Sequence, residues 1–273
     1  MHPTEREVRH YAEMGYLSSN NVFSSDEIAA LRVEIDRHVE SASLTGALEK
    51  DGKTIRALHG GHLESELFRH LITDPRLLLP AIKVLDGNVY LYQFKVSMKA
   101  AFVGGIWPWH QDYVYWYRED GMQNPHVTTA AIFVDDVNDE NAPILFLPRS
   151  HSEGLIDHQT NREESGTAEK GDWRENVVEN IKYTLAEPVV KRLANRTGIL
   201  SAKGRAGTVV FFHGNIVHAS TQNLSPFCRT IILVTYNRVT NAPRSAESST
   251  RPEFLVNRDL EALIPDSSAW PTT

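Results

Sequence analysis

The chain has 273 residues, of which 41% are hydrophobic, and its 28 basic and 35 acidic side chains give a formal net charge of −7. These values are typical of a globular enzyme and exclude disordered and fibrous proteins. The acidic balance and the lack of a basic run argue against a nucleic-acid partner. No hydrophobic stretch is long enough for a membrane helix, so we expect no membrane partner and a cytoplasmic location.

The cysteine and histidine content limits the kind of metal site that the chain can form. Its one cysteine, Cys228, cannot form an internal disulfide, which fits a reducing compartment. Twelve histidines beside a single thiol favour nitrogen and oxygen ligands over a zinc–thiolate site. The organic partner that we expect is therefore a small molecule, with a metal as the candidate cofactor.

Helical patterns occupy the first third of the chain. They predict helices over residues 4–14, 26–41 and 63–72. The first stops at Gly15, and Ser24 with Glu27 forms a capping box at the start of the second. The third ends before Pro75, because proline cannot continue a helix.

Strand patterns begin at residue 88. β-branched and aromatic residues predict strands over 89–96, 128–134, 144–147, 208–212 and 230–236. Turn residues separate these segments, and the strands follow the helices rather than alternate with them, so we expect an α+β fold with an antiparallel core.

We expect one domain over residues 1–273. It divides into a helical N-terminal part, a β-rich core and a C-terminal segment, at 1–87, 88–240 and 241–273. A polar segment at 151–204 interrupts the core, and its middle, 159–172, has few apolar anchors. Such long excursions are often lids or binding loops, so we predict a mobile, lid-like insertion here.

The most informative stretch is the aromatic run from Trp107 to Trp116. If it is a strand, His110 and Asp112 face the same side, where they can offer an imidazole nitrogen and a carboxylate oxygen to one ion. The same alternation predicts that Trp116 faces the pocket and that Tyr113 and Tyr115 face away.

A second histidine ligand is expected near the end of the predicted sheet, where His213 and His218 compete. Two histidines and one carboxylate leave adjacent positions open, a geometry diagnostic of non-haem iron(II) oxygenases. A chelating 2-oxo acid needs its far carboxylate held, and arginine does this with two parallel hydrogen bonds. Arg229 lies eleven residues after His218, beyond a turn, whereas His213 requires a longer return.

The sequence resembles the phytanoyl-CoA dioxygenase family of iron(II)- and 2-oxoglutarate-dependent oxygenases. The resemblance spans nearly the whole chain, at Gly15 to Leu17, Val22 to Ser24, Trp109 to Asp112, Asp120-Gly121, Pro148 to His151, and His218 to Arg229. Within this family the chain is similar to small-molecule hydroxylases, such as the ectoine hydroxylases and the bacterial leucine 5-hydroxylases.

The resemblance implies a double-stranded β-helix, or jelly roll, and a set of site residues. The implied iron(II) ligands are His110, Asp112 and His218, which together with Arg229 are the candidate catalytic residues. The implied contacts of 2-oxoglutarate are Lys99, Arg229 and Ser220, and those of the substrate are Gln93 and Trp116. From the residues themselves we add Arg56 and His59, which precede the core and could reach over the pocket to bind a substrate carboxylate.

We predict a dioxygenase that uses Fe(II), 2-oxoglutarate and O2 to hydroxylate an unactivated aliphatic C–H bond. The resemblance favours a free L-amino acid in specialised metabolism as substrate. The retained Asp112 favours hydroxylation over halogenation, while desaturation and cyclisation stay open. The alternatives are a terpenoid or polyketide substrate, a non-catalytic jelly-roll binding protein and a cupin-like metal isomerase. The oligomeric state stays open.

Overall fold

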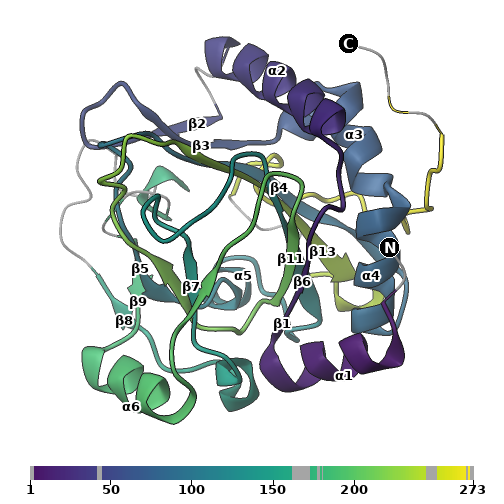
Figure 1. Ribbon diagram of the computed structural model, residues 1–273. Coiled ribbons are helices and arrows are strands. Elements are labelled where there is room, and N and C mark those ends of the chain that lie inside the picture. Colours follow the sequence, from purple (N-terminus) through teal and green to yellow (C-terminus); the bar gives the residue numbers. More distant parts are fainter. Residues whose placement is uncertain are drawn as a thin grey trace.

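The computed structural model describes residues 3–41, 45–161, 173–176, 179, 181–243, 251–268 and 270. Two antiparallel sheets form the centre of the molecule, and helices surround them (Figure 1). The large sheet has the strand order β1-β11-β6-β13-β4-β3-β2, and the small sheet has the order β10-β7-β12-β5. A two-stranded ribbon, β8-β9, lies apart from both sheets.

The elements have the following bounds. The strands are β1 (Tyr16–Ser19), β2 (Gly46–Leu48), β3 (Ile55–His59), β4 (Val89–Lys99), β5 (Trp107–His110), β6 (Val127–Phe133), β7 (Ile144–Phe146), β8 (Gln159–Thr160), β9 (Tyr183–Thr184), β10 (Leu200–Ala202), β11 (Val209–His213), β12 (His218–Ser220) and β13 (Arg229–Arg238). The α-helices are α1 (Glu5–Met14), α2 (Ser25–Ser41), α3 (Glu66–Thr73), α4 (Pro75–Leu85), α5 (Tyr113–Arg118) and α6 (Glu187–Thr197). Single 3-10 turns are η1 (Gly61–Leu63), η2 (Ser150–Glu153), η3 (Trp173–Asn176) and η4 (Val239–Asn241).

The first two helices begin and end where their sequence predicts. In α1, Thr4 and Glu7 form a capping box, and Gly15 ends the helix with a φ of 82°, a left-handed conformation that glycine adopts without strain. Before α2, the Glu27 carboxylate accepts from the Ser24 backbone N–H at 2.7 Å, and the Ser24 hydroxyl accepts from the Glu27 N–H at 3.3 Å.

The outer face of the large sheet holds the main hydrophobic core. Alternate residues of β4 and β13, such as Val96 and Ile232, are buried against α3 and α4 in one cluster with Leu71 and Leu77. These helices lie along the right-hand side of the sheet in Figure 1. Because strand side chains alternate between faces, this packing leaves the other residues of β4 and β13 facing the small sheet.

Register across the large sheet aligns polar residues on the inner face. Lys95 of β4 is paired with His59 of β3 on one side and with Leu233 of β13 on the other. Further along the same two strands, Lys99 is paired with Arg229. These three strands therefore bring cationic side chains to the space between the sheets.

Three strands in the N-terminal part were not predicted. β1 pairs with β11 and β3 pairs with β4, so this part contributes an edge and two further strands to the large sheet as well as its helices. A four-residue segment such as β1 gives too little periodicity to identify a strand from the sequence.

The 151–204 segment is only partly an excursion. Its last strand, β10, pairs with β7 inside the small sheet, and α6 precedes that strand. Residues 162–172, the centre of the stretch predicted to be mobile, lie outside the described residues.

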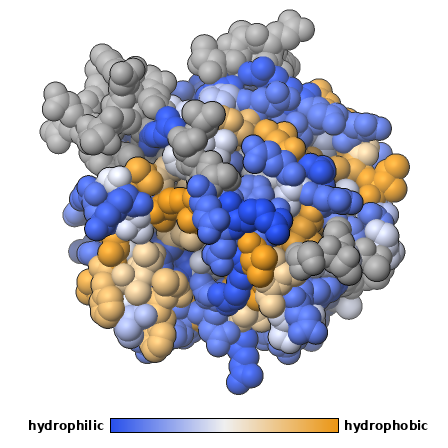
Figure 2. All heavy atoms as spheres, turned by 90° about the horizontal axis from the view of Figure 1, so that it is seen from above, coloured by the Kyte–Doolittle hydropathy of each residue, from blue (hydrophilic) through white to orange (hydrophobic). Residues whose placement is uncertain are grey.

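The view of Figure 2 shows hydrophobic residues in separate orange groups between hydrophilic regions, with no single apolar band. Within the described part of the chain, none of the helices has the length and hydropathy needed to cross a membrane.

Candidate metal centre and active site

Two strands of the small sheet bring the predicted histidines together. His110 ends β5, His218 begins β12, and the two are directly paired in the register of these strands. Their ring centroids lie 4.2 Å apart. His213, the competing histidine, belongs to β11 in the large sheet, where its Nδ1 accepts a hydrogen bond from the Asn215 N–H. The structure therefore selects His218.

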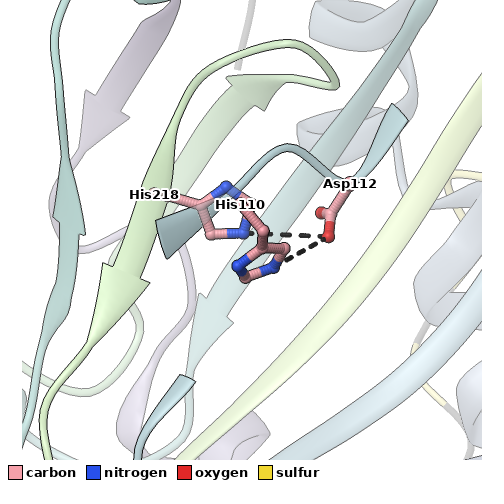
Figure 3. Close-up of side chains that lie close together, drawn as sticks. All are labelled: His110, Asp112 and His218. Atoms are coloured by element: carbon pink, nitrogen blue, oxygen red, sulfur yellow. Dashed lines mark ion pairs between the residues drawn. The ribbon is translucent and has the colours of Figure 1, made fainter. Parts of the chain in front are cut away.

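Asp112 completes the cluster, as Figure 3 shows. Its Oδ1 lies 3.5 Å from Nε2 of His110 and 3.7 Å from Nε2 of His218. The other ring nitrogens are hydrogen-bonded to backbone carbonyls, His110 Nδ1 to Pro108 at 2.6 Å and His218 Nδ1 to Ile216 at 3.0 Å. A carbonyl only accepts, so Nδ1 is the protonated nitrogen of each ring and Nε2 keeps its lone pair. The two Nε2 atoms and the Asp112 oxygen can therefore bind one cation between them.

The electrostatics of the cluster suit a cation. Burial, and then the charge of His110, lower the pKa of His218 to about 4, so its ring is neutral near pH 7. Burial opposes ionisation of Asp112, but the neighbouring His218 and His110 outweigh it and hold the pKa of this carboxyl below its usual range. The site thus combines two imidazoles with one carboxylate, a donor set that fits a non-haem iron(II) ion.

The structure corrects the predicted strand from Trp107 to Trp116. β5 ends at His110, and helix α5 begins at Tyr113, so Asp112 lies between a strand and a helix. Trp116 lines a cavity as expected, but so does Tyr115, which was predicted to face away. That prediction was wrong because a helix places both residues of this pair on the cavity side, whereas a strand would separate them.

One cavity beside the metal site contains Arg229, and we call it the arginine cavity. It is lined by Lys95, Ser97, Trp107, His110, Asp112, Ile144, Phe212, His218, Ala219, Ser220, Arg229, Ile231 and Leu233. Arg229 is 2% exposed, and its Nε has no hydrogen-bond partner among the described residues. Burial, and then the charge of Arg56, lower the pKa of Arg229 to about 9. A buried cation without enough counter-charge favours an anionic ligand.

Two further residues predicted to contact 2-oxoglutarate lie near Arg229 but differ in access. Ser220 lines the arginine cavity. Lys99 is buried and does not line it, because its Nζ donates to the backbone carbonyls of Gly105 and Thr221. Burial, and then the charge of Arg229, lower the pKa of Lys99 to about 6. A direct contact of Lys99 with a cosubstrate stays a prediction.

A second cavity meets the metal site from another side, and we call it the aromatic cavity. It is lined by His59, Gln93, Lys95, Trp107, His110, Asp112, Tyr115, Trp116, Trp173, Ile181, Arg251 and Leu255. The space within it, including its open mouth, is about 490 Å³. The predicted substrate residues Gln93, Trp116 and His59 all lie on its wall.

We expected the segment with Arg56 and His59 to reach over the pocket, but it does not. It forms strand β3 inside the large sheet, and both side chains are buried. Arg56 lines neither cavity. Its guanidinium pairs with Glu49 at 3.1 Å and stacks on the Trp107 ring, 3.9 Å from the centroid. Arg56 therefore supports a cavity wall from behind, and a direct contact with substrate stays a prediction.

The predicted substrate residues did not include the two cationic residues of the aromatic cavity, Lys95 and Arg251. Lys95 lies on the shared wall of both cavities, and period-two alternation from Gln93 would have placed it on the same face. Arg251 comes from the C-terminal segment, where no sequence pattern marks it. Its NH1 pairs at 2.6 Å with Asp120, which is fully buried and also accepts from the Tyr92 hydroxyl.

We expect Asp120→Ala to destabilise the protein by about 3–5 kcal/mol, because it removes the buried carboxylate that pairs with Arg251 and accepts from the Tyr92 hydroxyl. Urea unfolding measures this loss. Asp139→Ala is the matched control, since Asp139 and Lys203 form an exposed pair 2.8 Å apart that contributes less than about 1 kcal/mol. Equal losses in the two variants would contradict this assignment of the Asp120–Arg251 pair.

Comparison with known proteins identifies the family. The model of the family described as "Phytanoyl-CoA dioxygenase (PhyH)" matches residues 11–231. The chain belongs to the phytanoyl-CoA dioxygenase family. This match confirms the resemblance that the sequence motifs indicated, and it includes all three residues of the metal cluster as well as Arg229.

Relatives within the family act on small molecules. The chain is 38% identical over 255 residues to an L-proline trans-4-hydroxylase of Streptomyces griseoviridis, covering 93% of each protein. It is 31% identical to an ectoine dioxygenase of Stutzerimonas stutzeri, covering 92% of this chain and 83% of that protein. The crystal structure of EctD from S. alaskensis with 2-oxoglutarate and 5-hydroxyectoine matches with a TM-score of 0.79 and 27% identity, over 96% of this chain and 86% of that one.

Proposed function

We propose that this protein is an iron(II)- and 2-oxoglutarate-dependent dioxygenase that hydroxylates an aliphatic C–H bond of a free α-amino or α-imino acid. The observation that carries the proposal is the meeting of the arginine cavity and the aromatic cavity at one cluster, His110, Asp112 and His218. One cavity holds a buried arginine for a cosubstrate, and the other holds cations and aromatic rings for a substrate.

The two histidines and Asp112 would hold the iron(II), and both cavities are lined by His110 and Asp112. The bound iron, with 2-oxoglutarate and O2, supplies the oxidative chemistry that inserts oxygen into the C–H bond and releases succinate and CO2. The backbone carbonyls of Pro108 and Ile216 keep both rings in one tautomer and orientation.

Arg229 holds the far carboxylate of 2-oxoglutarate. Its planar fork offers two parallel donors, and the anion restores the charge balance of a guanidinium that is otherwise buried beside apolar residues such as Ile231 and Leu233. Ser220, on the same wall, can donate its hydroxyl to the same carboxylate.

The substrate carboxylate binds to Lys95 and Arg251 in the aromatic cavity. A guanidinium has five N–H groups, so Arg251 can contact Asp120 and a ligand at the same time. These two cations favour a small carboxylic acid over a neutral terpenoid or polyketide, which carries no anionic group to pair with them. The rings of Trp107, Trp116 and Trp173 enclose the rest of the ligand.

The fold assignment supports the proposal. We infer that the two facing sheets form a double-stranded β-helix within a single domain, and that the 151–204 insertion covers the aromatic cavity through Trp173 and Ile181. The likeness to EctD supports the jelly-roll assignment. A cytoplasmic location, the lack of a nucleic-acid partner and a role in specialised metabolism stay predictions.

The direct test is an assay of substrate-stimulated turnover. The protein is loaded anaerobically with iron(II) and 2-oxoglutarate, exposed to O2, and screened with L-proline and the twenty common amino acids for succinate release. We expect one or a few aliphatic amino or imino acids to stimulate release and to yield a product heavier by one oxygen atom. If 2-oxoglutarate binds but none of these acids stimulates turnover, the substrate class is wrong.

A further inference from the structure

His59 is a buried polar residue whose hydrogen-bonding groups are not used by the fold. It is 3% exposed and lies on the wall of the aromatic cavity. Neither of its ring nitrogens has a hydrogen-bond partner among the described residues. Most buried polar groups in proteins are paired, and an unpaired one costs free energy, so this exception needs a physical reason.

The surroundings of His59 keep its ring neutral. Burial, and then the charges of Lys95 and Arg251, hold the pKa of His59 well below its usual value. A neutral imidazole has one donor and one acceptor nitrogen. The ring of Trp173 packs edge-on against it, with centroids 5.2 Å apart and planes at 77°, so the orientation of His59 is restricted on one side.

Acceptors are scarce on the rest of this wall. Lys95 and Arg251 offer only donors, and the Tyr115 hydroxyl already accepts from the Tyr183 N–H. Gln93 donates its amide N–H to the Leu255 carbonyl and keeps its oxygen as an acceptor. Apart from the metal ligand Asp112 and the Tyr115 hydroxyl, which already accepts one bond, the side-chain acceptors on the described lining are His59 and Gln93.

We propose that His59 is a specificity-determining residue that accepts a hydrogen bond from the primary or secondary amine N–H of the substrate. This role of His59 rests on the proposed function. It adds to that function an explanation of how the site distinguishes an α-amino acid from a carboxylic acid without the nitrogen. His59 is the cross-strand partner of Lys95, so the acceptor lies directly beside a cation that holds the carboxylate. The two groups thus match the two substituents of one substrate α-carbon.

This arrangement makes the nitrogen of the substrate necessary for tight binding. An acid without the N–H leaves the acceptor of His59 buried and unpaired, and this costs about 1–3 kcal/mol, or roughly 10- to 100-fold in affinity. The variant His59→Leu removes the unpaired acceptor, so it weakens the binding only of ligands that carry the N–H.

The test compares ligand pairs that differ only in the nitrogen. These pairs are L-proline with cyclopentanecarboxylate, and L-leucine with 4-methylpentanoate. Dissociation constants are measured by anaerobic calorimetry on the full chain loaded with iron(II) and 2-oxoglutarate, and kcat/KM is measured for the same ligands. His59→Leu is compared with His62→Leu, a matched control, since His62 is also a buried histidine but lines neither cavity.

We expect His59→Leu to weaken binding of the amino or imino acid by about 10- to 100-fold and to leave the nitrogen-free acid unchanged, without altering the affinity for 2-oxoglutarate. His59→Asn, which keeps an acceptor, should recover part of the loss, and His62→Leu should preserve the discrimination. Equal losses of affinity for both members of a pair would overturn the role of His59 and leave the proposed function standing. The same holds if His59→Leu discriminates between the two members as well as the wild type does. If the wild-type protein binds 2-oxoglutarate but none of the amino or imino acids of the turnover screen, the proposed function fails and the role of His59 fails with it.

Discussion

Replacing His218 by alanine is expected to abolish iron(II) binding and, with it, turnover of 2-oxoglutarate. His218 supplies one of three ligand atoms that lie within 4.8 Å of one another, and the remaining pair cannot form a facial set. The loss should exceed the roughly 10- to 100-fold decrease in affinity that follows removal of an outer partner of a metal ligand. Equilibrium dialysis with iron(II) under anaerobic conditions measures it without relying on activity.

His213→Ala is the matched control for this variant. His213 lies five positions earlier, on β11, is largely buried, and lines neither cavity. It should retain iron(II) binding even if it lowers stability through the loss of its contact with the Asn215 N–H. If His213→Ala lost the metal and His218→Ala retained it, the assigned ligand set would be wrong.

Arg229→Ala should weaken 2-oxoglutarate binding by about 150- to 4000-fold, because loss of one partner from a buried charge pair costs about 3–5 kcal/mol. The guanidinium is almost fully buried in the arginine cavity, so solvent cannot replace it as a partner of the anion. The measurement is a titration of the visible charge-transfer band that iron(II) and 2-oxoglutarate form without O2. Iron(II) binding itself should be unchanged.

Two further variants separate charge from geometry at this position. Arg229→Lys keeps the positive charge but loses the planar fork, so it should fall between the wild type and Arg229→Ala. Arg192→Ala removes an arginine from an exposed pair with Glu153 and should leave the band unaffected. Unaltered 2-oxoglutarate affinity in Arg229→Ala would exclude the arginine cavity as the cosubstrate site.

Local sequence patterns were sufficient for helices α1 and α2, most of α3 and the five core strands. They missed α6 and also α4, because Pro75 begins a new helix rather than only ending α3. The family motifs indicated the three residues of the metal cluster. The capping box at Ser24 and the stop at Gly15 are interactions between near neighbours, so they can be read from the sequence. His218 was preferred over His213 because of its spacing from Arg229, and the structure places His218 and Arg229 on one cavity. The roles of Arg229, Lys99 and Ser220 toward 2-oxoglutarate stay predictions.

Patterns failed where the backbone changes conformation within a few residues. The run after His110 contains β-branched and aromatic residues typical of a strand, yet it forms α5. Its Tyr113, Tyr115 and Trp116 pack in one buried cluster with Tyr92. Propensity is a weak prior, and tertiary packing overrides it in a segment this short. The exposure of Tyr115 to the aromatic cavity follows from that change.

The sequence by itself determined which residue types form the metal site. It could do so because these residues lie in short motifs, each of which can be recognised from neighbouring positions in the chain. Only the tertiary structure decided which of the other polar residues share that site. Arg251 is more than 130 positions from Asp112, and His59 faces Lys95 only through the register of β3 with β4. Such contacts depend on how strands pair and how the C-terminal segment packs, and one chain's local pattern does not encode these long-range choices in a readable form.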